Sequence, residues 1–457
     1  MQVTTKLDYQ VVPRGEFFTV RLLVRLTPQT REEGARRPLN IGLVLDRSGS
    51  MEGEKLRCVK SASRQLISML SAGDILSITT FDDNAAGLVP AIPIEGGREA
   101  LISAVDWIEP GGWTDLCAGY ELGGASLQRT VSSAGLSRIL LLTDGLANVG
   151  TTEPILIADV VERFVGQGIS TSTIGIGSEY NEELLGTMAG SGGGATYFLS
   201  DPSEATDVFA EELGDLSSVD ARDVSVRFIP SVPALTAEQL NAYATDGLQR
   251  WRMGDLSGGA PRCLVLEIRT VGFGAPAGTE VLLGHVEVTC ECRSDDGYQP
   301  FSSLVPVSCR LGTRKDMDAM TPDRDVTLQA AYLMAARSVF TALSFADGGG
   351  FDQAAVCLET TANDLAKLRL ADELLNARLL DLRKRARQFR EEGSDSYDSY
   401  ARKRMYTESW YVGTCVSEKV QAMTDRAARY GSRSRRSSPA PGTTVESRSG
   451  YAGPTSR

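Results

Sequence analysis

Apolar and polar residues follow several successive patterns along the 457-residue chain. Residues 1–30 alternate with a period of two around a Pro-Arg-Gly turn, which predicts two strands. From Asn40 to about Ser217, apolar runs such as residues 41–46 alternate with amphipathic helical segments. Strands that alternate with helices at this spacing predict a mainly parallel, doubly wound sheet.

The rest of the chain changes pattern again. After Ser217, short strands divided by Gly and Pro predict an antiparallel β-sandwich. From about Pro322 the pattern is helical, and the glycines at 348–350 predict an αα-hairpin. A further helix is expected around residues 401–425. From Gly431 the chain is rich in Ser, Arg, Pro and Gly, which predicts disorder.

Together these patterns predict a multidomain protein of α/β, β and α parts. The first strands are too short to close a core alone, so we expect them to pair with the later strands, which makes the doubly wound, Rossmann-like domain an insertion in the sandwich. The predicted divisions are N-terminal sandwich strands at 1–37, the α/β domain at 38–217, the rest of the sandwich at 218–315, a helical hairpin or bundle at 320–427 and a basic tail at 428–457.

Charge and cysteine content narrow the class of protein. A net charge of -12 argues against binding to nucleic acid or to a membrane surface. The N-terminus lacks a signal pattern and no apolar run approaches membrane-spanning length, so we expect a cytoplasmic protein. The eight scattered cysteines favour reduced thiols. A thiolate metal site at Cys290 and Cys292, joined by Cys309 or Cys263, is the less favoured alternative because no CxxC pair supports it.

Candidate metal ligands follow the buried strands of the α/β region. The first of these strands ends in Asp46, which is followed by Ser48 and Ser50. Thr114 lies on a Gly-initiated loop, and Asp144 ends a second buried strand. Ligands bind at the carboxyl edge of such sheets, and hydroxyl and carboxylate oxygens suit Mg²⁺ that retains waters. The sequence therefore predicts a Mg²⁺ site from these five residues, with Mn²⁺ or Ca²⁺ as alternative ions.

This arrangement resembles the metal-ion-dependent adhesion site of the von Willebrand factor A-type (VWA) domain. The family pattern is Asp-x-Ser-x-Ser, a distant Thr, and an Asp that opens an Asp-Gly turn. The resemblance covers about residues 38–215, and residues 175–202 are similar to bacterial members and to the inter-alpha-trypsin-inhibitor heavy-chain type. It implies that the two serines and the threonine contact the metal directly, that the aspartates act largely through water, and that a partner's Asp or Glu completes the metal shell.

The predicted function is that of a non-enzymatic scaffold or adaptor in an intracellular complex. Within the family, bacterial relatives often act beside AAA+ ATPases or in kinase and phosphatase signalling, which makes an AAA+ ATPase or a Ser/Thr kinase a hypothetical partner. The alternatives are a subunit of such a system or a Mg²⁺-dependent phosphohydrolase. Aspartate-nucleophile phosphatases need a second aspartate where Ser48 stands. The single histidine, His285, lies in a predicted strand, which argues against triad and HExxH zinc chemistry.

Three other features carry weaker hypotheses. We expect Arg47, Trp113 and Asn148 to lie around the metal site and to influence which partner fits. The basic segment 382–390 is interpreted as a solvated helix face, with docking on an acidic partner as the alternative. Ser and Thr residues beside arginines and prolines in the tail raise the hypothesis of regulation by phosphorylation.

Overall fold

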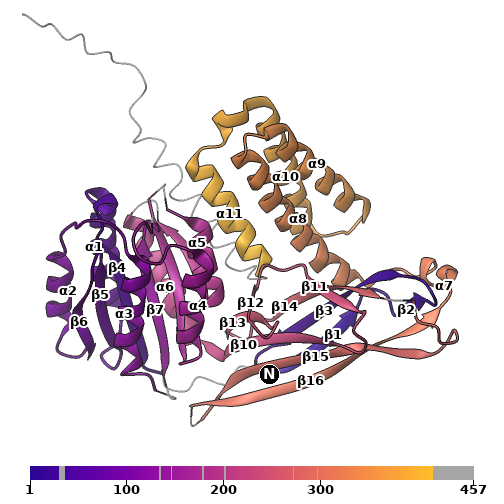
Figure 1. Cartoon of the computed structure of the whole chain (residues 1–457), viewed down its shortest axis with the longest axis horizontal. Coiled ribbons are helices and arrows are strands. Elements are labelled where there is room, and N and C mark those ends of the chain that lie inside the picture. The colour runs from indigo at the N-terminus through magenta and orange to yellow at the C-terminus, as the bar shows by residue number, and fades with distance from the viewer. Residues whose placement is uncertain are drawn as a thin grey trace, which may run out of the picture.

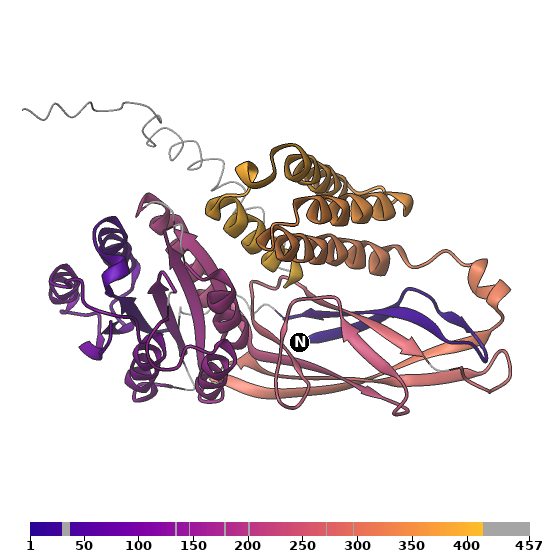
Figure 2. The ribbon, with the colours of Figure 1, turned by 45° about the horizontal axis from the view of Figure 1, so that its top comes forward.

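The computed structural model shows an α/β domain, a β-sandwich and a helical region (Figures 1 and 2). The structure describes residues 1–29, 37–132, 135–145, 147–177, 180–199, 202–270, 272–295 and 297–414. The basic tail expected at 428–457 lies outside these residues, as does the end of the helix expected at 401–425.

A six-stranded sheet with the order β6-β5-β4-β7-β8-β9 forms the centre of the α/β domain. Its strands are β4 (Leu39–Asp46), β5 (Ile75–Phe81), β6 (Ala85–Pro93), β7 (Leu136–Thr143), β8 (Ile169–Ile176) and β9 (Gly193–Leu199). All neighbours pair in parallel except β5 and β6, which are antiparallel. Strands β4 and β7 are buried along their whole length, as their apolar sequences require in a sheet that is covered on both faces.

Helices cover both faces of this sheet. They are α1 (Glu54–Met69), α2 (Arg98–Asp106), α3 (Leu116–Gln128), α4 (Pro154–Val165), α5 (Glu182–Ser191) and α6 (Ala205–Ser217), with short 3-10 helices η1 (Gly49–Met51) and η2 (Pro202–Glu204). Apolar residues of α1, α2 and α6 fill one core, and those of α3, α4 and α5 fill the other. The prediction of a doubly wound sheet is therefore confirmed.

Two sheets form the sandwich, with the orders β1-β3-β14-β11 and β12-β13-β10-β15-β16-β2, and all their neighbours are antiparallel except β16 and β2. The strands are β1 (Gln2–Leu7), β2 (Val11–Pro13), β3 (Phe18–Thr27), β10 (Val219–Pro230), β11 (Thr236–Gln239), β12 (Ala244–Thr245), β13 (Trp251–Ser257), β14 (Arg262–Thr270), β15 (Glu280–Ser294) and β16 (Gly297–Gly312). Strand β3 pairs with β14, and β2 pairs with β16, the latter in parallel. The N-terminal strands thus pair with the late strands, and the prediction of an α/β domain inserted in a sandwich is confirmed.

The first N-terminal segment differs from the sequence prediction. It was expected to form one strand, but it breaks at Asp8 into β1 and β2, which join different sheets. The Asp8 carboxylate accepts hydrogen bonds from the backbone N–H groups of Tyr9, at 2.9 Å, and of Arg21, at 2.8 Å. These bonds bind the chain at the point where it crosses from one sheet to the other, which explains the break.

The helical region follows the sandwich. It contains α7 (Arg314–Asp318), α8 (Arg324–Asp347), α9 (Phe351–Lys367), α10 (Glu373–Glu392), η3 (Gly393–Ser396) and α11 (Ser399–Gly413). Helices α8 and α9 form the expected hairpin around residues 348–350. The continuous helix expected after it is instead divided into α9 and α10, because Arg369 has a positive φ of 50° and Asp372 caps α10 by accepting a bond from Leu375 N.

Helix α8 is apolar because it is covered from two sides. One side packs on residues of β3 and β14, and the other side packs on α9 and α10. Among the described residues it is the helix long and apolar enough to cross a membrane, but 61% of its most apolar window is buried inside the protein. Its composition is therefore explained by the role of a core helix.

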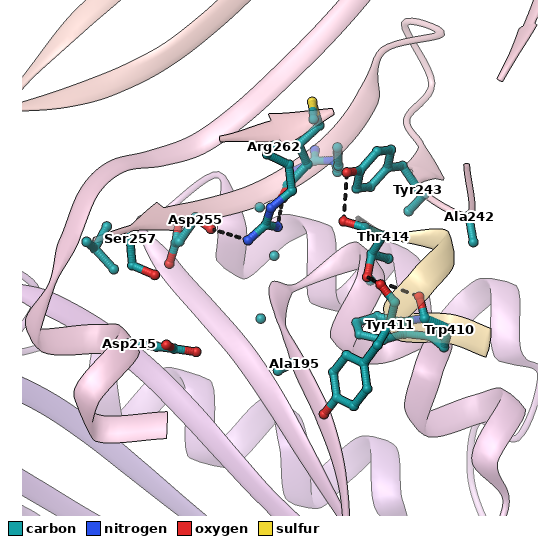
Figure 3. Close-up of a pocket in the computed structure, with 18 of the residues that line it drawn as sticks. Ala195, Asp215, Ala242, Tyr243, Asp255, Ser257, Arg262, Trp410, Tyr411 and Thr414 are labelled. Atoms are coloured by element: carbon teal, nitrogen blue, oxygen red, sulfur yellow. Dashed lines mark hydrogen bonds between the residues drawn. The ribbon is translucent and has the colours of Figure 1, made fainter. Parts of the chain in front are cut away.

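Helix α11, the last of the described helices, joins all three parts of the protein. Trp410 and Tyr411 pack on α5, and the Tyr411 hydroxyl donates to the carbonyl of Thr196 on β9. Tyr243 of the sandwich donates to the carbonyl of Thr414 at 2.8 Å. Figure 3 shows these side chains around a small cavity of about 60 Å³ where the three parts meet.

Arg138 of β7 anchors the α/β domain on the sandwich at the same junction. Its guanidinium is 5% exposed and pairs with Glu212 of α6 at 2.7 Å and with Asp255 of β13 at 2.6 Å. Figure 3 labels Asp255 beside Arg262, whose guanidinium donates to the Asp255 carbonyl at 3.4 Å. A buried charge with two carboxylate partners fixes the contact between the two domains.

Candidate metal centre

Strand β4 carries Asp46 to the carboxyl edge of the sheet, where the parallel strand β7 also ends. The Asp46 side chain is fully buried. Its Oδ1 accepts from Ser48 N at 2.8 Å, and its Oδ2 accepts from the Thr143 hydroxyl at 2.5 Å. The tight turn after the strand brings the hydroxyls of Ser48 and Ser50 within 3.1 Å of each other. Three of the five predicted ligands thus share one turn at the sheet edge.

Backbone hydrogen bonds hold the loop before α3 against this turn. Gly49 N donates to the carbonyl of Gly112 at 2.7 Å, and Gly111 N donates to the carbonyl of Arg47 at 2.6 Å. A Cβ atom on Gly111 would lie 1.8 Å from Oδ2 of Asp82, so this close approach requires glycine. The two glycines in front of Thr114 therefore let this loop pass close to Asp82 and Asp83, which follow β5.

Thr114 and Asp144 enter from the second and third loops. Thr114 is 1% exposed, and its N–H donates to Oδ1 of Asn148 at 2.8 Å. Asn148 N in turn donates to the Thr114 carbonyl at 3.1 Å. Asp144 follows β7 directly and is fully buried. The structure thus brings the three predicted loops to one edge of the sheet.

The Asp144 carboxylate shows a feature that fits a bound cation. Its Oδ2 accepts a hydrogen bond from the Lys55 ammonium at 2.9 Å, whereas its buried Oδ1 has no hydrogen-bond partner in the described structure. Buried polar oxygens are normally satisfied by protein, water or an ion. A cation at this oxygen would satisfy it.

Because Asp46 is buried, a nearby positive charge would stabilise its ionised carboxylate. Desolvation raises the pKa of Asp46 to about 6, against the lowering effect of its bonds from Thr143 and Ser48, and the charge of Asp144 raises it further. A divalent cation would relieve the repulsion between the two carboxylates. Two carboxylates and three hydroxyls form a hard oxygen set of low charge, so the residues fit Mg²⁺ with some positions left to water.

The predicted centre is not a cluster of acidic, histidine and cysteine side chains. In the described part of the chain, no group of three or more His, Cys, Asp or Glu residues is placed to hold a metal. The predicted centre has only two carboxylates and depends on hydroxyl groups. The same result gives no support to the alternative thiolate site, where the sulfurs of Cys290 and Cys292 lie 3.6 Å apart on β15.

The three residues expected around the site have different roles. Arg47 forms an ion pair with Asp82 at 2.6 Å, and Asn148 is bonded to Thr114, so both hold the loops together. Trp113 is 67% exposed beside Thr114. Of the three, Trp113 is the side chain best placed to contact a partner.

The basic segment 382–390 is mostly the solvated helix face that was expected, since Arg383, Lys384, Arg387 and Arg390 are exposed. Arg385 is 11% exposed and pairs with Asp381 at 2.7 Å and with Glu408 of α11 at 2.6 Å. Arg390 pairs with Glu359 of α9 at 2.8 Å. The interpretation as a solvated helix face is wrong for Arg385, because its partner Glu408 comes from another helix and could not be recognised in the local sequence.

Two residues at the site were not singled out from the sequence, namely Thr143 and Lys55. Thr143 precedes Asp144 and orients Asp46 through its hydroxyl. Lys55 lies in the first turn of α1, where the helix dipole disfavours a cation. That unfavourable position is the sequence signal that could have drawn attention to Lys55.

Comparisons with known proteins identify the domain that carries these residues. The family model of the von Willebrand factor type A domain matches residues 40–211. The Synechocystis protein sll0103 is 25% identical over 356 residues, which cover 75% of this chain and 82% of that protein. YfbK of Escherichia coli is 32% identical over 191 residues, or 41% of this chain, and bovine inter-alpha-trypsin inhibitor heavy chain H3 is 32% identical over 161 residues, or 33% of it. These matches span 33% of YfbK and 18% of the heavy chain.

Solved structures show the same fold over most of the chain. A von Willebrand factor type A protein from Catenulispora acidiphila matches with a TM-score of 0.69 and 17% identity, covering 89% of this chain and 96% of that one. The ArnB paralog VWA2 from Sulfolobus acidocaldarius matches with a TM-score of 0.57 and 16% identity, covering 90% and 97%. The chain therefore contains a von Willebrand factor type A domain, at residues 40–211.

Proposed function

We propose that the protein is a Mg²⁺-dependent interaction module whose VWA domain binds an acidic side chain of a partner protein. The observation that carries the proposal is the buried Asp144 Oδ1, which lacks a partner in the described structure at the edge where Asp46 and the serine hydroxyls gather. A buried carboxylate oxygen without a donor is costly, and a metal ion removes that cost.

The ligand inventory supports the role of a partner carboxylate. Mg²⁺ prefers six oxygen ligands, and the chain offers three hydroxyls and two carboxylates, so at least one position falls to water. When bound, the metal would supply a Lewis-acidic centre of low protein charge. Ser48, Ser50 and Thr114 would hold the ion, with Asp46 and Asp144 beside it, and one position would be left for an incoming Asp or Glu.

The geometry of Asp46 favours an interaction module over a phosphohydrolase. A phosphatase nucleophile must have a carboxylate oxygen free to attack the phosphorus atom. Both oxygens of Asp46 accept hydrogen bonds, and the side chain is buried. Ser48 stands where such enzymes place their acid/base aspartate, and a serine hydroxyl does not exchange protons readily near neutral pH.

The wider role that fits this site is that of a scaffold or adaptor in an intracellular, cytoplasmic complex. Similarity to the Synechocystis and Escherichia coli proteins supports a bacterial setting. An AAA+ ATPase or a Ser/Thr kinase system remains the hypothesis for the partner.

Calorimetric titration with Mg²⁺ and Mn²⁺ tests the metal site. We expect the wild type to bind one ion, and Asp46→Ala to lose binding while the far-ultraviolet circular dichroism spectrum is unchanged. Asp159→Ala removes an exposed aspartate from α4 of the same domain and is the matched control. Equal metal affinity in the wild type and in Asp46→Ala would contradict the assignment.

Partner capture tests the acidic ligand. Binding of a captured partner should require Mg²⁺, fail in EDTA, and weaken in Thr114→Ala, whose hydroxyl lies on a loop outside the apolar core. Capture to the same extent in all three conditions would place the interaction surface elsewhere. Hydrolysis of p-nitrophenyl phosphate with Mg²⁺, if lost in Asp46→Ala, would favour the phosphohydrolase instead.

A further inference from the structure

Lys55 forms an ion pair with one of the predicted metal ligands. It lies in the first turn of α1, and its ammonium donates to Oδ2 of Asp144 at 2.9 Å. The ammonium and the unpartnered Oδ1 therefore belong to the same carboxylate. A metal ion at Asp144 has to share this group with Lys55.

The fold makes room for the lysine side chain at this position. Gly177, just after β8, has a φ of +77°, and a Cβ atom there would lie 3.1 Å from Cε of Lys55. The Lys55 side chain is 22% exposed, whereas Asp144 is fully buried. A cation in the first turn of a helix is opposed by the helix dipole, so the contact with Asp144 offsets an unfavourable position.

A count of charges shows what Lys55 changes. Asp46 and Asp144 contribute two negative charges, and Lys55 contributes one positive charge. A divalent ion then leaves the loaded site with a net charge of about +1, whereas without Lys55 the loaded site would be neutral. Arg47 adds no net charge, because it is paired with Asp82.

We propose that Lys55 adjusts the site for carboxylate capture: it weakens binding of the metal and strengthens binding of an anionic ligand by the metal-loaded site. The inference rests on the proposed function and identifies the residue that sets the balance between its two steps, metal binding and carboxylate binding. Lys55 thereby acts as a specificity-determining residue for acidic partners.

The expected effects have opposite signs and different sizes. At a separation of about 6 Å, even in a medium as polar as water, one unit charge changes the affinity of a divalent cation about tenfold and that of a carboxylate about threefold. Removing the charge of Lys55 should therefore strengthen metal binding more than it weakens carboxylate binding. Loss of a merely structural contact would weaken both.

The test uses the full chain with Mn²⁺ as the metal and acetate as the carboxylate. Calorimetry gives the Mn²⁺ dissociation constant, and the proton relaxation rate of water reports acetate that displaces metal-bound water. For Lys55→Met, whose side chain keeps much of the length of lysine, we expect about tenfold tighter Mn²⁺ and about threefold weaker acetate. Lys55→Gln should behave in the same way, and Lys55→Arg should keep both constants close to wild type. Lys367→Met, which removes an exposed charge from α9, is the remote control.

The outcomes separate this inference from the proposed function. If the wild type binds no Mn²⁺, both fail. If the wild type binds Mn²⁺ and acetate but the neutral Lys55 variants match it, or weaken both ligands, only the role of Lys55 is refuted. A Lys55→Arg variant that behaves like Lys55→Met would also overturn the inference, because charge would then not be the cause.

Discussion

Lys403 of α11 is expected to hold the helical region against the VWA domain. It is 5% exposed, although lysine is rarely buried. Its ammonium donates to the carbonyl of Tyr180 at 2.6 Å and to the Glu182 carboxylate at 2.9 Å, and it lies 4.5 Å from the centre of the Tyr180 ring. We predict that Lys403→Met releases α11 from α5 without unfolding the domain.

The magnitude follows from these contacts. Hydrogen bonds to charged groups contribute about 1.5–3 kcal/mol each, and removing one partner of a buried ion pair costs about 3–5 kcal/mol. Arg402 also pairs with Glu182, so the remaining carboxylate keeps one cationic partner. We therefore expect a loss near the lower limit, about 3 kcal/mol, which corresponds to a roughly hundredfold change in the opening equilibrium.

Amide hydrogen exchange read by mass spectrometry measures this loss locally. Protection in residues 399–413 should fall about a hundredfold in Lys403→Met, while protection in β4 stays at the wild-type level. Lys384→Met removes an exposed lysine from α10 and is the control. Adding Glu182→Gln to Lys403→Met should restore part of the protection, because it removes the carboxylate whose partner was lost. Unchanged protection in Lys403→Met would refute this role of Lys403.

Four further variants test the packing and charge of the fold by urea and thermal denaturation. Gly123→Ala should destabilise the protein by about 1–3 kcal/mol, because the new Cβ would lie 2.3 Å from a side chain of β4. Gly214→Ala in α6 meets no atom within 4 Å and should stabilise the protein by about 1 kcal/mol. Equal effects of the two variants would contradict this reasoning. Burial raises the pKa of Asp8 to about 6, so its contribution to stability is present below about pH 4 and is lost as the pH rises through 6. Asp8→Asn should flatten this dependence and raise stability at pH 7 by up to about 3 kcal/mol, and an unchanged pH profile would count against it. Arg138→Met should lower the free energy of unfolding by about 3–5 kcal/mol, since Glu212 then loses its buried guanidinium partner. An unchanged free energy of unfolding would refute the role of Arg138 as an anchor between the domains.

The architecture could be predicted because its signals are local and repeated. Parallel strands place their carboxyl ends at one edge, so the ends of two buried strands were enough to bring Asp46 and Asp144 together. The same reasoning predicted that strands too short to close a core would pair with later strands, as β3 does with β14. These conclusions followed from periodicity alone and required no knowledge of side-chain contacts.

The errors arose where a single side chain decides the path of the backbone. The break at Asp8 depends on two bonds to its carboxylate, and the division between α9 and α10 depends on a positive φ at Arg369 and on the cap at Asp372. Apolar periodicity continues through all three positions, so it predicted one strand and one helix. Capping and turn geometry interrupt the backbone without changing that pattern.

Contacts between distant segments left the weakest trace in the sequence, although they help to hold a loop beside the predicted metal site. Lys403 lies 223 positions after Tyr180, whose carbonyl it binds, and no periodic pattern links residues at that distance. Asn181, between the two residues that Lys403 contacts, donates its N–H to the carbonyl of Asp144 at 3.2 Å. The segment that leads into α5 is thus bonded to Asp144 on one side and to α11 on the other. The helical region therefore supports one of the loops that border the predicted metal site, and a fragment limited to the VWA domain would lack that support.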